Sequence, residues 1–237
     1  MIALFCALLE MWAGPEVAAR RIGFRDRLTP GLAGWQSGAQ PLFRLDVLAH
    51  LTRGLPVIDD LGFFGWYARS VVKSQTLTAD GSLGFETQQI AWEAGARYRL
   101  VIDGEECGAA SIAYGSLRND FNGPSLGGVL LPAGTLQYWR PGVEMRVPIG
   151  RVALFAGAGW LAPVRQDAVG AAFPRSSSGG VDAALRAEMT LGAFLLRGSV
   201  RYMRFFYSLH PLPYDPYVAG GALDELASAS LALGYRL

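Results

Sequence analysis

The chain ends on the stretch "LASASLALGYRL", residues 226–237, in which two kinds of side chain alternate. One side of an extended chain would carry Ala227, Ala229, Leu231, Leu233, Tyr235 and Leu237. The other side would carry Leu226, Ser228, Ser230, Ala232, Gly234 and Arg236. Successive side chains of a β-strand point to opposite faces. This period of two therefore predicts a final strand with one apolar face and one small, polar or charged face.

The same alternation recurs along the chain, for example in 44–51, 91–100, 138–147, 181–189 and 196–205. Short turns and long loops rich in Gly, Pro and Ser separate these segments in alternation, as in an antiparallel meander with all short turns at one end. We place about ten strands, near residues 20–27, 41–53, 61–75, 85–102, 105–117, 135–147, 151–163, 179–190, 194–208 and 224–237.

The composition indicates what the two faces contact. Hydrophobic residues make up 51% and charged residues 17%, below the roughly 25% charged of ordinary soluble proteins. No run of about 20 apolar residues predicts a membrane-spanning helix. Glycine, of which there are 30, is rare on water-exposed strands but fits a crowded barrel interior. The sequence therefore predicts an all-β fold: a closed antiparallel up-and-down transmembrane β-barrel of about ten strands, within a range of about eight to twelve. A soluble barrel with the opposite polarity is the alternative.

We expect residues 1–18 to precede the barrel as a degenerate signal-like or upstream segment, and residues 19–237 to form it. The opening "MIALFCALLEMWAGPEVAA" is apolar but has no basic start, and Glu10 interrupts it. Cys6 and Cys107 are too few for a disulfide framework.

A row of charged side chains is predicted to face the lumen. It comprises Asp46, Glu93, Arg97, Arg99, Arg140, Glu144, Arg146, Asp182, Arg186, Glu188, Arg197, Arg201 and Arg236. Eight arginines against five acids would leave the lumen modestly cationic. Two interpretations stay open: a plug of paired charges or a narrow anion-preferring pore for small solutes. Barrels of about eight strands are filled by side chains, which favours the plug.

Aromatic residues are predicted to mark the two membrane interfaces: Trp92, Trp139, Trp160 and Phe206 toward the long loops, and Tyr98 and Tyr235 toward the short turns. Aromatics are also simply common in strands. The last residues resemble the C-terminal insertion signal of bacterial outer-membrane proteins through Ser230, Tyr235 and Leu237. Ala232 stands where glycine is usual, and the chain ends on leucine.

Several segments resemble an uncharacterised group of outer-membrane β-barrel proteins from myxobacteria and their relatives. They are "GFFGWYARSV" (62–71), "YWRPGVEMRVPIG" (138–150), "FPRSSSGGVDA" (173–183) and "RYMRFFYSLHPLPYDPYVAGGALDE" (201–225). The resemblance implies an outer-membrane barrel, with no established catalytic or ligand residues to carry over.

Few residues of the sequence suggest a catalytic or metal-binding site. His50 falls on the polar side of its strand and His210 in a proline-rich loop, with no serine at a spacing that suggests a nucleophile–base pair. We expect no enzyme, metal site, cofactor or nucleic-acid partner.

The predicted partners are the outer-membrane bilayer and, through the last strand, the barrel-assembly machinery. The role predicted is to anchor exposed loops from a bacterial outer membrane, with both termini periplasmic; a pore is the alternative, and a lipid-modifying enzyme a more distant one. Of the loops, 164–180 is expected to be flexible and 210–221 to be an ordered projection.

Overall fold

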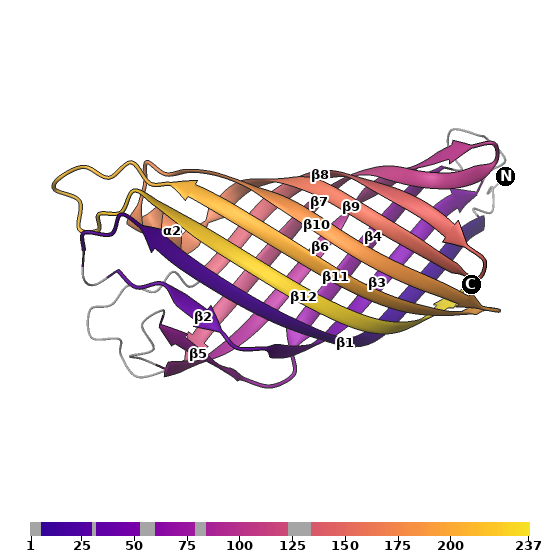
Figure 1. Cartoon of the computed structure of the whole chain (residues 1–237), viewed down its shortest axis with the longest axis horizontal. Coiled ribbons are helices and arrows are strands. Elements are labelled where there is room, and N and C mark those ends of the chain that lie inside the picture. Colours follow the sequence, from indigo (N-terminus) through magenta and orange to yellow (C-terminus); the bar gives the residue numbers. More distant parts are fainter. Residues whose placement is uncertain (1–5, 30–31, 53–59, 79–83, 123–133) are drawn as a thin grey trace, which may run out of the picture.

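The computed structural model describes residues 6–29, 32–52, 60–78, 84–122 and 134–237. Within these ranges twelve strands form one antiparallel sheet, and the last of them pairs with the first to close it into a barrel (Figure 1). Ten of these strands form the main wall in the described part of the chain: β1 (Cys6–Arg25), β3 (Gln40–Thr52), β4 (Leu61–Ser70), β6 (Gly84–Ile102), β7 (Glu105–Asn122), β8 (Gly134–Ile149), β9 (Val152–Gln166), β10 (Ser177–Leu191), β11 (Phe194–Ser208) and β12 (Gly221–Arg236). The predicted closed antiparallel barrel is confirmed.

The two remaining strands complete the wall at the long-loop end. β2 (Trp35–Ser37) and β5 (Ser74–Thr78) pair with each other and bridge β1 to β6, where β3 and β4 have already ended. No helix in these ranges has the length and apolarity to cross a membrane.

The two ends of the barrel differ as the loop lengths predict. β6–β7, β8–β9 and β10–β11 are joined by two-residue turns with a glycine at positive φ, namely Gly104, Gly150 and Gly192. β1 begins and β12 ends at this short-turn end (Figure 1). The opposite end carries the long connections and the short helix α2 (Asp167–Ala172). The segment 164–180, which we expected to be flexible, is ordered here because Val169 and Phe173 are buried in the barrel's apolar core.

The first strand starts well before its predicted position. Residues 6–18 form the beginning of β1, and from Glu10 onward they pair with β12 on one side of the strand. Glu10, which we took as an interruption of an apolar run, is a buried inward residue, and Met11 beside it is exposed on the outer face. The expected boundary at residue 19 thus cuts through a strand of the barrel wall.

Over the half of the barrel near the short turns, the apolar face looks outward. Val143, Met145 and Leu233 are 62%, 59% and 59% exposed, whereas the inward Glu93 and Asp182 are 1% and 5% exposed. Such a wall is compatible with a lipid bilayer. Closed ladders pair the backbone groups, and the charged side chains face one another inside the barrel.

Toward the long-loop end the polarity of the wall inverts. Inward side chains there form a large apolar core, including Leu117, Tyr138 and Phe205, each at most 1% exposed. The outward neighbours include Arg21 and Arg204. The expectation of a polar lumen therefore holds for one half only. The loop-side half has the apolar-in, polar-out pattern of a soluble barrel, as expected of a part that projects beyond the hydrocarbon.

Aromatic pairs flank the outward apolar surface. Near the long-loop end Tyr114 lies between Trp92 and Trp139, with ring centroids 5.8 and 5.1 Å away. Trp160 and Phe206 lie 5.6 Å apart. Near the short-turn end Phe194 packs edge-on against Tyr235 at 5.5 Å, and Tyr98 is 37% exposed on the outer face of β6.

Candidate functional site: the charged layer of the lumen

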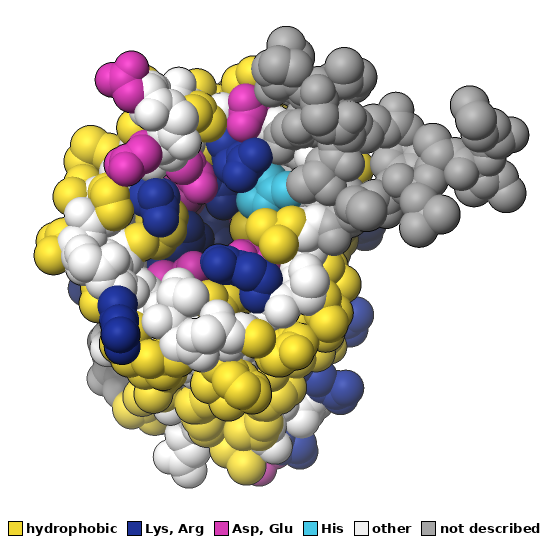
Figure 2. All heavy atoms as spheres, turned by 90° about the vertical axis from the view of Figure 1, so that its right-hand side faces the viewer, with side chains coloured by type: hydrophobic (Ala, Val, Ile, Leu, Met, Phe, Trp, Pro, Cys, Tyr) yellow, Lys and Arg dark blue, Asp and Glu magenta, His cyan; other side chains and the backbone are white. Residues whose placement is uncertain are grey.

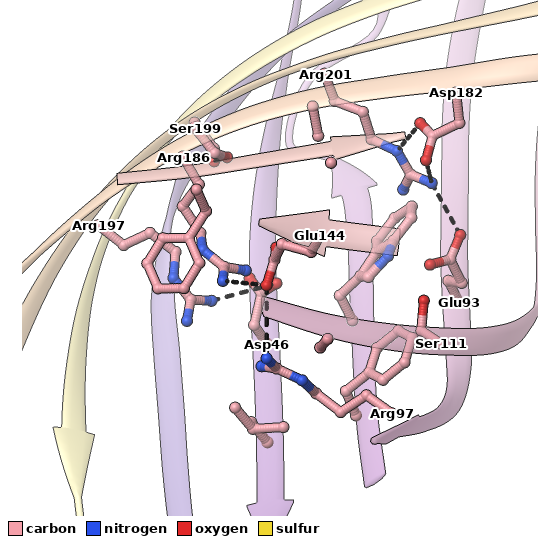
Figure 3. Close-up of a pocket in the computed structure, with 18 of the residues that line it drawn as sticks. Asp46, Glu93, Arg97, Ser111, Glu144, Asp182, Arg186, Arg197, Ser199 and Arg201 are labelled. Atoms are coloured by element: carbon pink, nitrogen blue, oxygen red, sulfur yellow. Dashed lines mark hydrogen bonds and ion pairs between the residues drawn. The ribbon is translucent and has the colours of Figure 1, made fainter. Parts of the chain in front are cut away.

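The thirteen residues predicted to face the lumen all lie on the inner face of the barrel. They come from β3, β6, β8, β10, β11 and β12, so no single strand builds the site. Viewed from the short-turn end, the barrel mouth is hollow and lined by basic and acidic side chains (Figure 2). Deeper in, these side chains meet in the layer drawn in Figure 3.

The most buried group of the layer is the carboxylate of Glu93. Arg140 donates to it at 2.6 Å, Arg201 at 3.0 Å and the Tyr138 hydroxyl at 3.2 Å. Arg201 also donates to Asp182 at 2.7 and 3.2 Å, and Asp182 lies 3.6 Å from Arg140. Two arginines and two acids therefore neutralise one another where water scarcely reaches, the arrangement that buried ions require.

A second cluster centres on Glu144. Arg186 donates to it at 3.0 Å and Arg97 approaches it at 3.5 Å (Figure 3). The guanidinium of Arg186 also lies 3.9 Å from the ring centroid of Phe155, and Arg97 pairs with Glu106 at 2.6 Å. Stacking on an aromatic face adds a cation–π attraction to the ion pair.

Arg44 and Arg197 connect the third part of the layer. Arg44 donates through two nitrogens to Asp46, each at 2.9 Å, and reaches Glu16 at 3.1 Å. Arg197 pairs with Glu188 at 2.9 Å and lies 4.0 Å from Asp46.

Aromatic faces hold these two arginines in place. The Arg197 guanidinium lies 3.4 Å from the ring centroid of Trp12, and that of Arg44 lies 4.4 Å from Trp66. Each cation is thereby fixed by a ring as well as by carboxylates, which limits its rotamers.

Three predicted residues lie nearer the short-turn end. Arg236 donates to Glu10 at 2.5 Å, and Arg99 approaches Asp60 at 3.2 Å. Arg146 donates to the backbone carbonyl of Glu106 at 3.3 Å. Arg146 and Arg236 border a recess of about 730 Å³ at the barrel mouth, which is also lined by the turns after β8 and β10.

Seven further charged residues of the described ranges face the interior and were not predicted. They are Arg20, Arg44, Glu10, Glu16, Asp60, Glu106 and Asp224. The expected excess of three arginines thus disappears among the residues described, since ten arginines face ten acids. Arg44 was on the predicted polar side, and the period of two would have revealed Glu10 and Glu16 had residues 1–18 been treated as strand.

The charged layer ends at the apolar core. Arg20 and Asp224 form a two-hydrogen-bond pair at 2.8 and 2.6 Å on the core side, where Arg20 is 7% exposed. Tyr138 joins the two zones, since its hydroxyl reaches Glu93 and its ring packs 5.6 Å from Phe205. Within the layer itself a cavity of about 180 Å³ remains.

The histidines do not meet. His50 is 5% exposed on the inner face of β3, and neither ring nitrogen has a hydrogen-bond partner in the described structure. His210 lies in the loop that follows β11, at the other end of the barrel. Within the described ranges no group of three His, Cys, Asp or Glu side chains has an arrangement able to hold a metal ion.

The C-terminal strand seals the barrel. Ser230 lies inside, with its hydroxyl 2.7 Å from that of Ser199, whereas Tyr235 and Leu237 face outward. The backbone N–H of Leu237 donates to the carbonyl of Leu9 at 2.9 Å, so the closure extends to the last residue.

No family model and no curated protein matches the sequence. Solved structures do resemble the fold. The outer membrane protease OmpT from Escherichia coli has a TM-score of 0.53 at 10% identity, covering 98% of this chain and 98% of that one. The translocator domain of autotransporter NalP from Neisseria meningitidis has a TM-score of 0.46 at 14% identity, covering 96% and 88%. The β domain of the Bordetella autotransporter BrkA has a TM-score of 0.40 at 14% identity, covering 94% and 98%. Only the first score exceeds 0.5, and identities this low speak for the fold alone. The closed barrel, the apolar outer face over its short-turn half and the likeness to OmpT show that the chain has the fold of an outer-membrane β-barrel.

Proposed function

We propose that this chain is an integral outer-membrane protein of a Gram-negative bacterium whose closed barrel anchors ordered loops outside the cell. Both termini would lie in the periplasm, and the last strand would be recognised by the barrel-assembly machinery through Ser230, Tyr235 and Leu237. The role is structural or one of surface interaction, and the lumen conducts no solute.

The observation that carries the proposal is the double obstruction of the lumen. The charged layer crosses the barrel with its guanidinium and carboxylate groups paired at 2.6–3.6 Å around Glu93. Above it lies the apolar core, in which Leu117, Leu161 and Phe205 are at most 1% exposed. Ions would have to break a buried charge network and then cross a dry core, and both steps are costly.

The loop side is suited to display. The loop after β11 is tied to its neighbours: Val218 donates to Thr29 Oγ1 at 2.8 Å, and Leu28 donates back to the carbonyl of Val218 at 3.0 Å. Arg175, which precedes β10, donates a hydrogen bond to Asp215 in this loop. Tyr214 is 97% exposed at its surface. An ordered loop with an exposed aromatic side chain binds a partner at a lower entropic cost than a disordered one.

Planar-bilayer recording tests closure. The purified wild-type chain should give no steady openings. Tyr138→Ala with Phe205→Ala removes a pair of packed rings from the apolar core and should also stay silent while the charged layer persists. Adding Arg201→Ser should produce openings. Trp160→Ala with Phe206→Ala is the matched control, since it removes a pair 5.6 Å apart on the lipid-facing wall.

A narrow pore is the second candidate, favoured by the recess at the short-turn mouth. Steady wild-type openings that disappear on Ser199→Phe, in the wall of the lumen cavity, would establish the pore and refute closure. The near balance of inner charges supports no strong anion preference.

An enzyme is not part of the proposal, although OmpT is named a protease. His50→Ala and His210→Ala test this directly. Turnover of lipid or peptide that either substitution abolishes would overturn the non-enzymatic assignment.

A further inference from the structure

Three charged residues form a row on the outer wall at the long-loop end. Register places Glu225 of β12 opposite Arg21 of β1 on one side and Arg204 of β11 on the other. The Nε atoms of Arg21 and Arg204 lie 2.6 and 3.9 Å from the Glu225 carboxylate. The arginines are 64% and 44% exposed, whereas Glu225 is 13% exposed. The row therefore presents two cations to the surroundings over one covered anion.

The height of this row is set by the strand register. At the short-turn end of the same strands, Tyr235 lies opposite Met11 and Phe194. Ten residues of β12 separate Tyr235 from Glu225, which is roughly 24–28 Å along the barrel axis for strands tilted by about 35–45°. The apolar band of a membrane barrel is about 25 Å tall. The row thus lies where lipid headgroups begin.

A groove in the apolar wall leads up to the row. It has a volume of about 970 Å³, and alanines form much of its floor, among them Ala19, Ala183, Ala227 and Ala229. Val200 and Tyr202 line it as well. Ala19, Ala227 and Tyr202 are the next outward positions from Arg21, Glu225 and Arg204 on their strands. The groove and the cationic row are therefore continuous.

The chemistry of the row fits a phosphate group. Glu225 contacts each arginine through Nε, and in the described structure the terminal guanidinium nitrogens of Arg21 and Arg204 have no protein acceptor. Tyr202 donates its hydroxyl to Glu225 from the groove side. Guanidinium groups held in this way bind phosphate oxygens through paired hydrogen bonds, and cations at this depth favour an anionic headgroup over hydrocarbon.

We propose that this face binds one phosphate-bearing membrane lipid. Its phosphate lies between Arg21 and Arg204, and one of its acyl chains lies in the alanine-floored groove. The site is on the outer wall in the leaflet of the long-loop side, so it does not depend on whether the lumen is closed.

Native mass spectrometry of the detergent-solubilised full chain tests the site, with diphosphorylated lipid A and its dephosphorylated form as probes. The wild type should retain one phosphorylated lipid, and Arg21→Gln with Arg204→Gln should weaken retention by at least about tenfold. Arg118→Gln with Arg165→Gln is the matched control. These arginines are 55% and 60% exposed and pair with Asp120 and Asp167 away from the groove; the control should retain the lipid like the wild type.

Two further measurements separate the sources of binding. Ala183→Leu with Ala229→Leu should weaken retention with both arginines intact, because larger side chains fill the groove. Excess inorganic phosphate should not displace the lipid. Resistance of each variant to unfolding in SDS serves as the folding control. Equal losses in both arginine pairs, displacement by inorganic phosphate, or equal retention of the dephosphorylated probe would overturn the proposal.

Discussion

Replacing Glu93 by glutamine tests whether the charged layer is a dry plug. The substitution keeps the shape of the side chain but removes the negative charge that Arg140 and Arg201 share at 2.6 and 3.0 Å. Asp182 would then face two guanidinium groups alone. Because Glu93 is 1% exposed, water cannot take over the lost interaction.

The magnitude follows from this burial. Breaking a buried ion pair by removing one partner costs about 3–5 kcal/mol. Asp182 remains 2.7 Å from Arg201, and the glutamine oxygen still accepts a hydrogen bond. We therefore expect a loss near the lower end, about 3 kcal/mol, or roughly a hundredfold in the folding equilibrium.

The assay is urea unfolding of the chain in lipid vesicles, followed by tryptophan fluorescence. Glu86→Gln is the control, since its ion pair with Lys73 is 55% and 45% exposed and should contribute at most about 1 kcal/mol. Glu93→Leu with Arg140→Met restores the balance of charge and should recover most of the lost stability.

A loss for Glu93→Gln no larger than that for Glu86→Gln would refute the reasoning. It would mean that water screens the Glu93 site, as in an aqueous channel, and the closed-barrel proposal would lose its main support.

Three further outcomes are expected. Gly14→Ala should lower the folded fraction in SDS gels, because a Cβ there would meet the backbone carbonyl of the facing strand β12. Arg197→Lys should cost about 1–2 kcal/mol in urea unfolding, because the ammonium cannot reproduce the guanidinium's stacking on Trp12. The hydrogen bond from Arg175 holds the pKa of Asp215 below its usual value. Hence the loop should keep its protection from pepsin above about pH 4 and lose it as pH falls through the lowered, folded-state pKa; Asp215→Asn should abolish this pH dependence.

The alternation of side chains was enough to predict much of the wall. Residues such as Arg140 and Val143 differ so strongly in their preference for lipid that a strand containing both has one orientation in a membrane barrel. Fold, approximate strand count and the inward direction of Arg201 or Glu144 follow from this period of two.

Both ends of the barrel differ from the structure that the sequence predicted. At the start, an apolar stretch containing Glu10 was interpreted by its composition, although the same alternation continues through it. At the loop end, Met203 and Phe205 share a face with Arg201, which signals that the interior changes from polar to apolar. That signal carries no meaning until the edge of the hydrocarbon along the strand is known.

By itself the sequence determined which side of each strand turns inward, because that choice depends only on neighbours along the chain. Closure of β1 on β12 decided the rest. It brings Glu10 to Arg236 and Arg20 to Asp224, partners more than 200 positions apart. It also aligns Arg21, Glu225 and Arg204 on the outer wall. Such pairings depend on register and strand tilt, which the three-dimensional barrel fixes and local alternation does not.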